Sequence, residues 1–585
     1  MPGFHVENFG CRAARADGEA VSDRLRAAGH GPRQPAQAEV VIVNTCSVTA
    51  EADREALSYI RRMHRVNPAA KIVVTGCYAQ RAPEELADLE GVAAVVGNSH
   101  KALVPQIAAE LFQHDANSSS VGVSNARHWD SSPPATDLEV SFVTGHDFSR
   151  AESAERMRGA SAPATELVTI QSLLAIGAAR APILADDRFA HSFLEEAQVA
   201  PGERTRPNLK IQEGCGNRCS FCVIPQTRGS SRSLPAESVL KQVNGFVAAG
   251  GKELVLSGIN LGRWGRDLQS EPGRRPREFV PLHASQVPES GTWGTQLVNL
   301  RAVRDLVNIN PSLCRPLERT TKDGAPSLSR NALAWLVRRI FAETELPRLR
   351  LSSIEPMDWD SEMIALMAEY GGSRLARHAH LPLQSGSDAV LRRMHRRYRP
   401  WHYAQKVAEL IRVAGPEFTL GADVMVGFPG ETDREFKETM ELVQALPFGY
   451  LHIFPFSARP GTRAWALHAE SPVPTDVVRE RLEVLRALAA VKTRAHRELF
   501  VGSTLEAITL HTSADLARRG LTRALSENFL PVEIRGKLPS NRLVAVRVTG
   551  MNSEAALEAA FRPENAQAEV RAFQEPARPA SHLNL

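Results

Sequence analysis

The sequence has few cysteines and no long apolar segment, and each shortage excludes a class of protein. Seven cysteines among 585 residues is a low and odd number, which disfavours a disulfide scaffold in an oxidising compartment. No window reaches the ~18 uninterrupted apolar residues that a membrane helix needs. The first residues, MPGFHVENFG, lack the apolar core of a signal peptide. We therefore expect a cytoplasmic protein without membrane contact.

A strong excess of charge of one sign is also missing. The chain has 70 basic and 66 acidic residues and a net charge of +4, which neither requires nor excludes a polyanionic partner. Apolar residues make up 43% and charged residues 23%, and these values exclude wholesale disorder. A chain of this length predicts about three to six domains, each able to bury a core.

Hydrophobic periodicity divides most of the chain into two α/β regions. Runs rich in Val and Ile alternate with amphipathic helical patterns and predict a small parallel α/β domain over 1–112. Ser, Ala and Pro accumulate over 113–205, which we interpret as a linker with an insertion. Six strand–helix units over 206–470 predict a partial (β/α)6 barrel. A proline-containing segment at 266–331 interrupts them as a surface insertion.

The carboxyl-terminal part has a different pattern. A helix at 471–498 connects the second α/β region to short alternating strands over 499–562. This alternation is typical of a small antiparallel β barrel. The last residues, 563–585, have the composition of a frayed tail. The predicted fold class is therefore α/β, ending in a small β barrel.

Three cysteines are crowded in KIQEGCGNRCSFCVIP, where Cys215, Cys219 and Cys222 follow a predicted strand. Closely spaced thiolates select zinc or an iron–sulfur cluster. Structural zinc usually has four protein ligands, yet no His or other Cys occurs between 192 and 282. A [4Fe–4S] cluster with one open iron can bind S-adenosylmethionine and generate a 5′-deoxyadenosyl radical. A zinc site with a distant fourth ligand and unrelated thiols are the alternatives.

Three other cysteines, Cys11, Cys46 and Cys77, each come just after a predicted strand, in ENFGC, VIVNTC and IVVTGC. The carboxyl ends of parallel strands meet at one edge of a sheet, where ligand sites form. The three thiolates are thus expected to converge on a second cluster with a free iron. The alternative is that they are small buried apolar residues. Cys314 lies in the insertion without a partner pattern, and we assign it no role.

Together these patterns resemble the methylthiotransferase family of radical S-adenosylmethionine enzymes. The resemblance covers about 1–112, 205–265 and 332–550. It is also carried by NTCSVTAEAD (44–53), VTGCYAQRAPEEL (74–86), LSSIEP (351–356), LPLQSGSDAVLRRM (381–394), ADVMVGFPGET (422–432) and FPFSARPGT (454–462). VTGCYAQ, the basic run after QSGSD and FPFSARPGT are most similar to the branch that acts on threonylcarbamoyladenosine beside the tRNA anticodon. Ala14 departs from the family, which usually has Asn at this position.

The resemblance implies a chemistry for both cysteine sets. It implies that one [4Fe–4S] cluster, on Cys215, Cys219 and Cys222, cleaves S-adenosylmethionine. It implies that an auxiliary [4Fe–4S] cluster, on the amino-terminal cysteines, delivers sulfur to C2 of the adenine ring. The implied partners are tRNA, a reduced electron donor such as flavodoxin or ferredoxin, and a sulfur donor.

Three carboxylates are candidate contacts to S-adenosylmethionine. Glu253 begins a predicted strand, at a position where the resemblance implies a group that meets the methionine ammonium. Glu355 and Asp423 lie at or within predicted strands, where a carboxylate is costly unless it is paired or contacts a ligand. The alternatives are a solvated loop carboxylate for Glu253 and structural ion pairs for the other two.

Two groups of arginines are candidates for binding tRNA phosphates. The first follows QSGSD and contains Arg392, Arg393, Arg396, Arg397 and Arg399. The second, on the small barrel that resembles an RNA-binding TRAM module, contains Arg518, Arg519 and Arg523. Because aromatic residues are scarce there beyond Phe529, we expect contacts to the backbone and shape of the RNA more than base stacking. The alternative is that these arginines are merely solvated.

Other functions compete with methylthiolation of threonylcarbamoyladenosine. The substrate could instead be isopentenyladenosine in tRNA or an aspartate of a ribosomal protein, although QSGSD at 384–388 disfavours the latter. A non-catalytic iron–sulfur RNA-binding redox sensor predicts clusters without cleavage of S-adenosylmethionine. A zinc-stabilised RNA-binding module predicts a colourless protein loaded with zinc.

Overall fold

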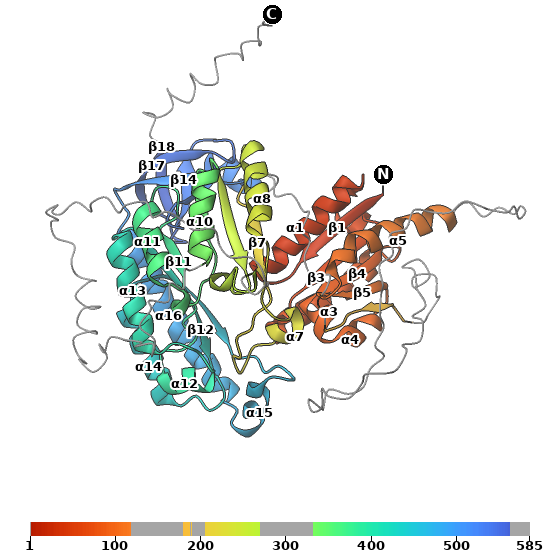
Figure 1. Ribbon diagram of the computed structural model, residues 1–585, viewed down its shortest axis with the longest axis horizontal. Coiled ribbons are helices and arrows are strands. Elements are labelled where there is room, and N and C mark those ends of the chain that lie inside the picture. The colour runs from red at the N-terminus through yellow and green to blue at the C-terminus, as the bar shows by residue number, and fades with distance from the viewer. Residues whose placement is uncertain (1, 119–179, 188, 190–204, 269–331, 562–585) are drawn as a thin grey trace, which may run out of the picture. The chain divides into compact units, whose positions relative to one another are not determined.

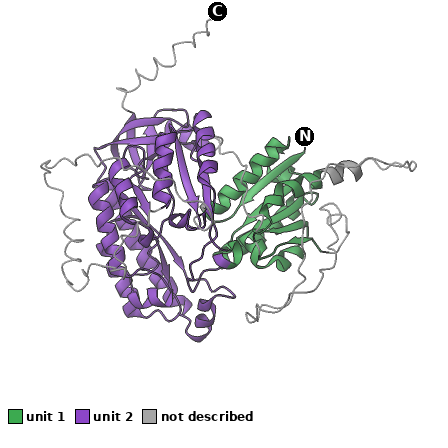
Figure 2. Ribbon diagram, in the orientation of Figure 1, with its two compact units in different colours: residues 1–197, 226–229 green, residues 198–225, 230–585 purple. Residues whose placement is uncertain are grey.

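A computed structural model describes residues 2–118, 180–187, 189, 205–268 and 332–561 (Figure 1). The predicted insertion is described only at 266–268, and the tail and Cys314 lie outside the described residues. The chain forms two compact units, one of residues 1–197 with 226–229 and the other of residues 198–225 with 230–585 (Figure 2).

The first unit is built on one parallel sheet of six strands in the order β2-β1-β3-β4-β5-β6. The strands are β1 (Gly3–Asn8), β2 (Gly31–Pro32), β3 (Val40–Thr45), β4 (Lys71–Gly76), β5 (Val92–Gly97) and β6 (Ile183–Leu184). The α helices are α1 (Arg12–Ala27), α2 (Ala50–Val66), α3 (Cys77–Arg81), α4 (Pro83–Ala87) and α5 (Val104–Ser118). The predicted parallel α/β arrangement is confirmed, and β6 adds a strand from the segment predicted as a linker.

Buried aliphatic residues explain why this sheet is covered on both faces. Along a strand, successive side chains point to opposite faces, and β3 places Val40 and Ile42 in one core and Val41 and Val43 in the other. Residues of α1 and α5 complete the first core, and residues of α2, α3 and α4 complete the second. Such uninterrupted Val and Ile runs are typical of parallel strands buried on both sides.

The second unit contains two sheets, with strand orders β10-β9-β7-β8 and β11-β12-β13. The strands are β7 (Asn208–Glu213), β8 (Arg232–Ser233), β9 (Glu253–Gly258), β10 (Arg348–Leu351), β11 (His378–His380), β12 (Thr419–Val426) and β13 (Phe448–Pro455). All except the short edge strand β8 pair in parallel. The Ile354 amide donates to the His380 carbonyl at 3.1 Å, which joins the two sheets. Six parallel strands in chain order confirm the predicted partial barrel.

Helices follow the strands as the sequence predicts. They are α7 (Ile224–Arg228), α8 (Ala236–Ala248), α10 (Ala332–Glu343), α11 (Ser361–Tyr370), α12 (Asp388–Arg393), α13 (Pro400–Ala414), α14 (Asp433–Ala445), α15 (Arg463–Glu470) and α16 (Thr475–Glu498). Short 3-10 turns occur at Pro35–Gln37, Lys101–Leu103, Leu261–Arg263 and Pro356–Asp358. Among the described residues, no helix is both long and apolar enough to span a bilayer.

The carboxyl-terminal strands close into a barrel in the order β14-β15-β16-β18-β17. They are β14 (Thr504–Thr509), β15 (Leu521–Ser526), β16 (Pro531–Arg535), β17 (Leu543–Met551) and β18 (Leu557–Phe561), with the short helix α17 (Ala514–Arg518) after β14. The predicted small barrel is confirmed, with one parallel pair, β16 and β18, among antiparallel ones.

This barrel packs against the amino ends of the central strands within the second unit. The Arg350 guanidinium donates to the carbonyls of Ser526 at 3.2 Å and Glu527 at 2.9 Å. Arg377 donates to the Glu527 carboxylate at 2.8 Å, and Asn528 donates to the Glu417 carbonyl at 2.8 Å. The barrel and the central sheets thus form one unit, and the division into separately folding domains stays a prediction.

Candidate active site

The loop that carries Cys215, Cys219 and Cys222 leaves the carboxyl end of β7 and is fixed at its middle. The Ser220 amide donates to the Met394 carbonyl at 3.1 Å, and its hydroxyl donates to the Arg393 carbonyl at 2.8 Å. Since α12 ends at Arg393, that helix end holds the loop at the carboxyl end of β7, and parallel sheets place their ligand sites at the carboxyl ends of their strands.

The three thiols of this loop lie close enough to influence one another. Burial raises the pKa of Cys222 to about 12, and the neighbouring thiols of Cys219 and Cys215 raise it as well. Cys215 accepts hydrogen bonds from the Asn217 amide and the Asn260 side chain, both at 3.5 Å. Such thiols become thiolates at neutral pH when a cation binds them. Hydrogen-bond donors around the sulfurs are typical of metal-ligating cysteines.

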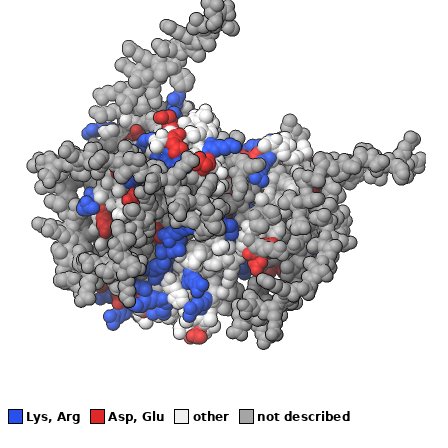
Figure 3. Space-filling model, viewed as in Figure 1, with Lys and Arg blue, Asp and Glu red and all other residues white. Residues whose placement is uncertain are grey.

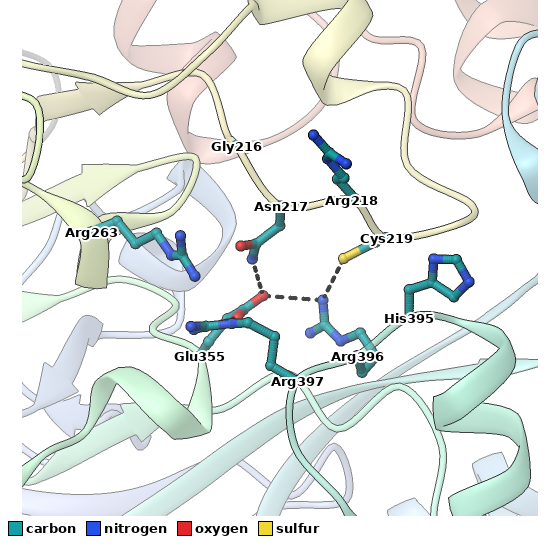
Figure 4. A pocket seen from close by; sticks show the side chains of 9 residues that line it. All are labelled: Gly216, Asn217, Arg218, Cys219, Arg263, Glu355, His395, Arg396 and Arg397. Carbon is teal, nitrogen blue, oxygen red and sulfur yellow. Dashed lines mark hydrogen bonds and ion pairs between the residues drawn. The ribbon is translucent and has the colours of Figure 1, made fainter. Parts of the chain in front are cut away.

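A cavity of about 310 Å³ opens beside Cys219. Its lining residues, drawn in Figure 4, are Gly216, Asn217, Arg218, Cys219, Arg263, Glu355, His395, Arg396 and Arg397. No group of three His, Cys, Asp or Glu side chains in the described part of the chain forms a site for a single metal ion. A [4Fe–4S] cubane differs from a site for a single metal ion because each thiolate binds a different iron atom.

Glu355 is the centre of the polar network in this cavity. Its carboxylate accepts hydrogen bonds from Asn217 at 2.9 Å, Arg396 at 3.2 Å and Arg397 at 3.3 Å (Figure 4). Glu355 directly precedes the 3-10 turn that begins at Pro356, just beyond the carboxyl end of β10. Among the three carboxylates predicted to contact S-adenosylmethionine, Glu355 is the one that lines the cavity beside a predicted cluster ligand.

Arg396 is a site residue that the sequence pattern assigned to a different role. Its guanidinium donates to the Cys219 sulfur at 3.3 Å and to the Tyr398 hydroxyl at 3.1 Å. Arg396 is only 8% exposed and is bound to these groups, which disfavours the predicted contact with tRNA phosphate. The arginine run alone gave no sign of this, since only the fold brings it to Cys219.

The other arginines of that run are also paired with carboxylates. Arg392 and Arg399 pair with Asp388 at 2.8 and 3.3 Å. Arg393 pairs with Glu435 at 2.8 Å. Arg397 pairs with Asp358 at 3.1 Å as well as with Glu355. The positive charge that the sequence pattern suggested for RNA binding is thus largely paired with carboxylates of the protein. Phosphate binding by these four residues stays a prediction.

Glu253 lies at the opposite end of the sheet from the cysteine loop. It is the first residue of β9, fully buried, and its carboxylate lies 2.9 Å from Arg350 and 3.4 Å from Arg348. Burial alone raises the pKa of Glu253, but the guanidinium groups of Arg350, Arg206 and Arg348 outweigh it and hold that pKa below its usual value. These observations indicate a structural ion pair for Glu253, and a contact with S-adenosylmethionine stays a prediction.

Asp423 points from the middle of β12 toward histidines of the neighbouring strands. Its carboxylate lies 3.1 Å from the His380 imidazole. Burial raises the pKa of Asp423, but the hydrogen bond and charge of His380, with His452 nearby, lower it overall. The structural pair that we considered as the alternative is present, and a contact with S-adenosylmethionine stays a prediction.

The first unit brings the other three cysteines to the carboxyl edge of its sheet. Cys11, Cys46 and Cys77 follow β1, β3 and β4, which are neighbours in that order. Gly10 has φ +104°, and a Cβ there would lie 2.7 Å from the Cys46 sulfur, so only glycine lets the chain approach this closely. Burial raises the pKa of Cys46 to about 12, with added effects from the thiols of Cys77 and Cys11.

The predicted RNA-binding residues of the carboxyl-terminal barrel differ in their surroundings. Arg518, Arg519 and Arg523 are exposed, and Arg518 pairs with Asp515 at 3.3 Å. The Phe529 ring instead lies 4.4 Å from the His378 ring, inside the packing between the barrel and the central strands. Phe529 is therefore partly used in this packing, and the arginines stay candidates for phosphate contacts.

Comparison with known proteins agrees with this geometry. The model described as "Uncharacterized protein family UPF0004" matches residues 3–97, and that of the radical SAM superfamily matches residues 323–443. These matches and the strand-end cysteines define a radical S-adenosylmethionine enzyme with a second cysteine-bearing unit.

Curated relatives extend along most of the chain. The chain is 28% identical to threonylcarbamoyladenosine tRNA methylthiotransferase MtaB of Bacillus subtilis, over 91% of this chain and 90% of that protein. It is 28% identical to MtaB of Aquifex aeolicus, over 93% of this chain and 99% of that protein. A tRNA-2-methylthio-N(6)-dimethylallyladenosine synthase of Syntrophobacter fumaroxidans is 26% identical over 94% of this chain and 95% of that protein. These matches and relatives support a radical S-adenosylmethionine methylthiotransferase that is similar to MtaB.

Proposed function

We propose that this enzyme adds a methylthio group to C2 of threonylcarbamoyladenosine beside the anticodon of tRNA. The observation that carries the proposal is the pair of cysteine triplets, each at the carboxyl edge of its own parallel sheet, in a chain whose MtaB relatives align over nearly its full length. A C–H bond of an aromatic ring has no proton that a side chain removes at neutral pH, which favours a radical route.

The proposal assigns a [4Fe–4S] cluster to each triplet. The cluster on Cys215, Cys219 and Cys222, when bound, supplies the electron that cleaves S-adenosylmethionine, and an auxiliary cluster on the other triplet supplies sulfur. Three thiols in each set, with donors directed at the sulfurs of Cys215, Cys219 and Cys77, fit a cubane that keeps one iron open. The number of clusters is part of the proposal.

The cavity beside Cys219 suits the methionine part of S-adenosylmethionine, which carries both an ammonium and a carboxylate. Glu355 offers a carboxylate to the ammonium, while Arg263 and Arg397 offer guanidinium donors to the carboxylate. Asn217 and Arg396 hold Glu355 in place through the hydrogen bonds described above. These residues therefore bind and orient the substrate without moving a proton.

tRNA is the proposed macromolecular substrate, with a reduced electron donor such as flavodoxin or ferredoxin, a sulfur donor and a cytoplasmic location. Figure 3 shows Lys and Arg side chains gathered on one face of the second unit. The exposed arginines of the small barrel, Arg518, Arg519 and Arg523, add further positive groups. Such groups bind phosphates without reading sequence.

The direct test is mass spectrometry of tRNA nucleosides from a strain that lacks the gene. We expect the methylthio derivative of threonylcarbamoyladenosine to disappear, and to return with the wild-type gene but not with Cys219→Ala. A Gly245→Ala variant is the matched control, because this helix position has open space around it. An unchanged nucleoside profile would contradict the proposal.

A second candidate substrate is dimethylallyladenosine (isopentenyladenosine), because one family relative that aligns over 94% of this chain is a synthase of its methylthio derivative. In the same strain, loss of that derivative instead of the threonylcarbamoyl one would favour it. Loss of methylthioaspartate from a ribosomal protein would point to the protein-modifying branch. Clusters and tRNA binding without formation of 5′-deoxyadenosine under reduction would indicate a redox sensor.

A further inference from the structure

Cys77 accepts two hydrogen bonds that its sequence neighbourhood does not predict. The Nε of Arg228 lies 3.2 Å from the Cys77 sulfur, and the Nδ2 of Asn98 lies 3.4 Å from it. All three residues are buried, with exposures of 0% for Arg228, 1% for Asn98 and 3% for Cys77. The sulfur is thus held by a charged and a neutral donor away from solvent.

Arg228 is fixed in this place by a buried ion pair. Its Nη1 lies 3.2 Å from the Asp17 carboxylate, which also receives Lys101 at 3.1 Å. Burying a guanidinium costs free energy unless it is paired and hydrogen-bonded. The position of Arg228 between Asp17 and the Cys77 sulfur therefore indicates a role beyond packing. Arg228 also lies close enough to Cys46 to act against the rise of its pKa. The positive charge of Arg228 thus lies near two cysteines of the triplet.

The segment that supplies Arg228 comes from the other cysteine motif. Residues 226–229 pack with the first unit, although the chain before and after them belongs to the second. Asn98 holds this segment as well, because its Nδ2 donates to the Thr227 carbonyl at 2.9 Å. The stretch of chain that begins at Cys215 therefore also contributes a sulfur donor to the amino-terminal triplet.

We propose that Arg228 and Asn98 are positioning residues of the auxiliary cluster. By donating to the Cys77 thiolate, they fix this ligand and raise the reduction potential of the cluster, because donors and positive charge stabilise its more negative, reduced state. Asp17 keeps Arg228 directed at the sulfur. The inference rests on the proposed function in one respect, namely that Cys11, Cys46 and Cys77 hold a cluster.

The test isolates the auxiliary site in the full chain. Cys215, Cys219 and Cys222 are replaced by Ala, the protein is reconstituted anaerobically, and the potential is measured by a redox titration followed by electron paramagnetic resonance. In this background, Arg228→Gln and Asn98→Ser are expected to shift the potential to more negative values. They should also weaken iron retention against a chelator by about 10- to 100-fold. Arg228→Lys keeps the charge without the planar donor and should fall between wild type and Arg228→Gln.

The matched control is Arg54→Gln in the same background, since Arg54 is an exposed arginine of the first unit that pairs with Glu51. It should leave both the potential and the iron retention unchanged. If Arg228→Gln does not fold, Asn98→Ser decides the matter, because it removes a donor without removing a buried charge.

The outcomes separate the two proposals. Absence of iron from the background protein, with the triplet otherwise intact, overturns the proposed auxiliary cluster itself. A cluster that assembles and keeps its potential and iron retention in Asn98→Ser, and in Arg228→Gln where that variant folds, overturns the inference about positioning while the proposed function stands.

Discussion

The two cysteine triplets reach similar surroundings from different backbones. In the first unit, three neighbouring strands bring together cysteines that lie far apart in sequence. In the second unit, one loop after β7 carries all three. Yet in both triplets a buried arginine donates to a sulfur and is held by a carboxylate, Arg228 by Asp17 and Arg396 by Glu355. The shared feature is thus the electrostatic environment of the thiolate and not the sequence motif.

The two carboxylates nevertheless differ in what else they face. Asp17 is shared by Arg228 and Lys101 within the protein interior. Glu355 lines a cavity of about 310 Å³ with additional guanidinium groups. In the proposed assignment, the first arrangement would insulate a cluster, while the second would leave room for a small charged molecule beside one. This difference matches a division between sulfur supply and cleavage of S-adenosylmethionine.

The largest expected effect separates the two triplets by their products. Cys219→Ala should abolish both reductive formation of 5′-deoxyadenosine and methylthiolation, because the cluster that cleaves S-adenosylmethionine is lost. Cys46→Ala should abolish methylthiolation but leave 5′-deoxyadenosine formation. Chromatography of assay mixtures measures both products. Loss of 5′-deoxyadenosine formation in both variants would contradict the proposed division of roles between the two triplets.

Asp17 and Glu355 are expected to differ in their effects on protein stability and on the rate of 5′-deoxyadenosine formation. Asp17→Asn should lower the free energy of unfolding by about 3–5 kcal/mol, because it leaves buried cations without their partner. Glu355→Gln should cost less stability, since its network borders an open cavity, but should slow 5′-deoxyadenosine formation about 10- to 100-fold, the usual range for residues that support a metal site. Urea unfolding measures the loss of stability, and product assays measure the rate of 5′-deoxyadenosine formation. A larger loss of stability in Glu355→Gln, or a larger loss of rate in Asp17→Asn, would contradict this prediction.

Replacing Gly10 tests how closely the chain packs against Cys46 in the first triplet. Gly10→Ala should destabilise the protein by more than about 1 kcal/mol, because φ is positive there and the new Cβ collides with Cys46. It should also lower the iron content of the first unit. Gly31→Ala, with open space around it, is the control for thermal unfolding and iron analysis. Equal behaviour of the two variants would show that Cys46 has no such close neighbour.

The smallest effect concerns tRNA affinity. Arg523→Ala should weaken binding several-fold and reduce the slope of log affinity against log salt by about 0.7–0.9, because an exposed phosphate contact is lost. Arg396→Gln should leave this slope unchanged, since Arg396 is buried at Cys219. Binding titrations at several salt concentrations measure both. A change of slope in Arg396→Gln but not in Arg523→Ala would instead indicate that Arg396 contacts the RNA.

Much of the fold follows from local sequence, and the site does so only in part. The Val-rich runs before Cys46 and Cys77 predict both the strands and the edge at which the thiols meet. The contacts of Arg228, Arg396 and Glu253 depend on which strands and helices pack together, so composition and periodicity cannot reveal them. Glu253 shows this most clearly, because the first residue of a strand lies at the end of a parallel sheet away from the cysteine loop, and the sequence alone does not show which arginines pair with it there.

Iron analysis of anaerobically reconstituted protein can show whether each triplet holds its own cluster. We expect about eight irons per wild-type chain, and about four when either triplet is replaced by alanine. About four irons in the wild-type chain, with no loss when Cys11, Cys46 and Cys77 are replaced, would contradict a separate cluster on each triplet.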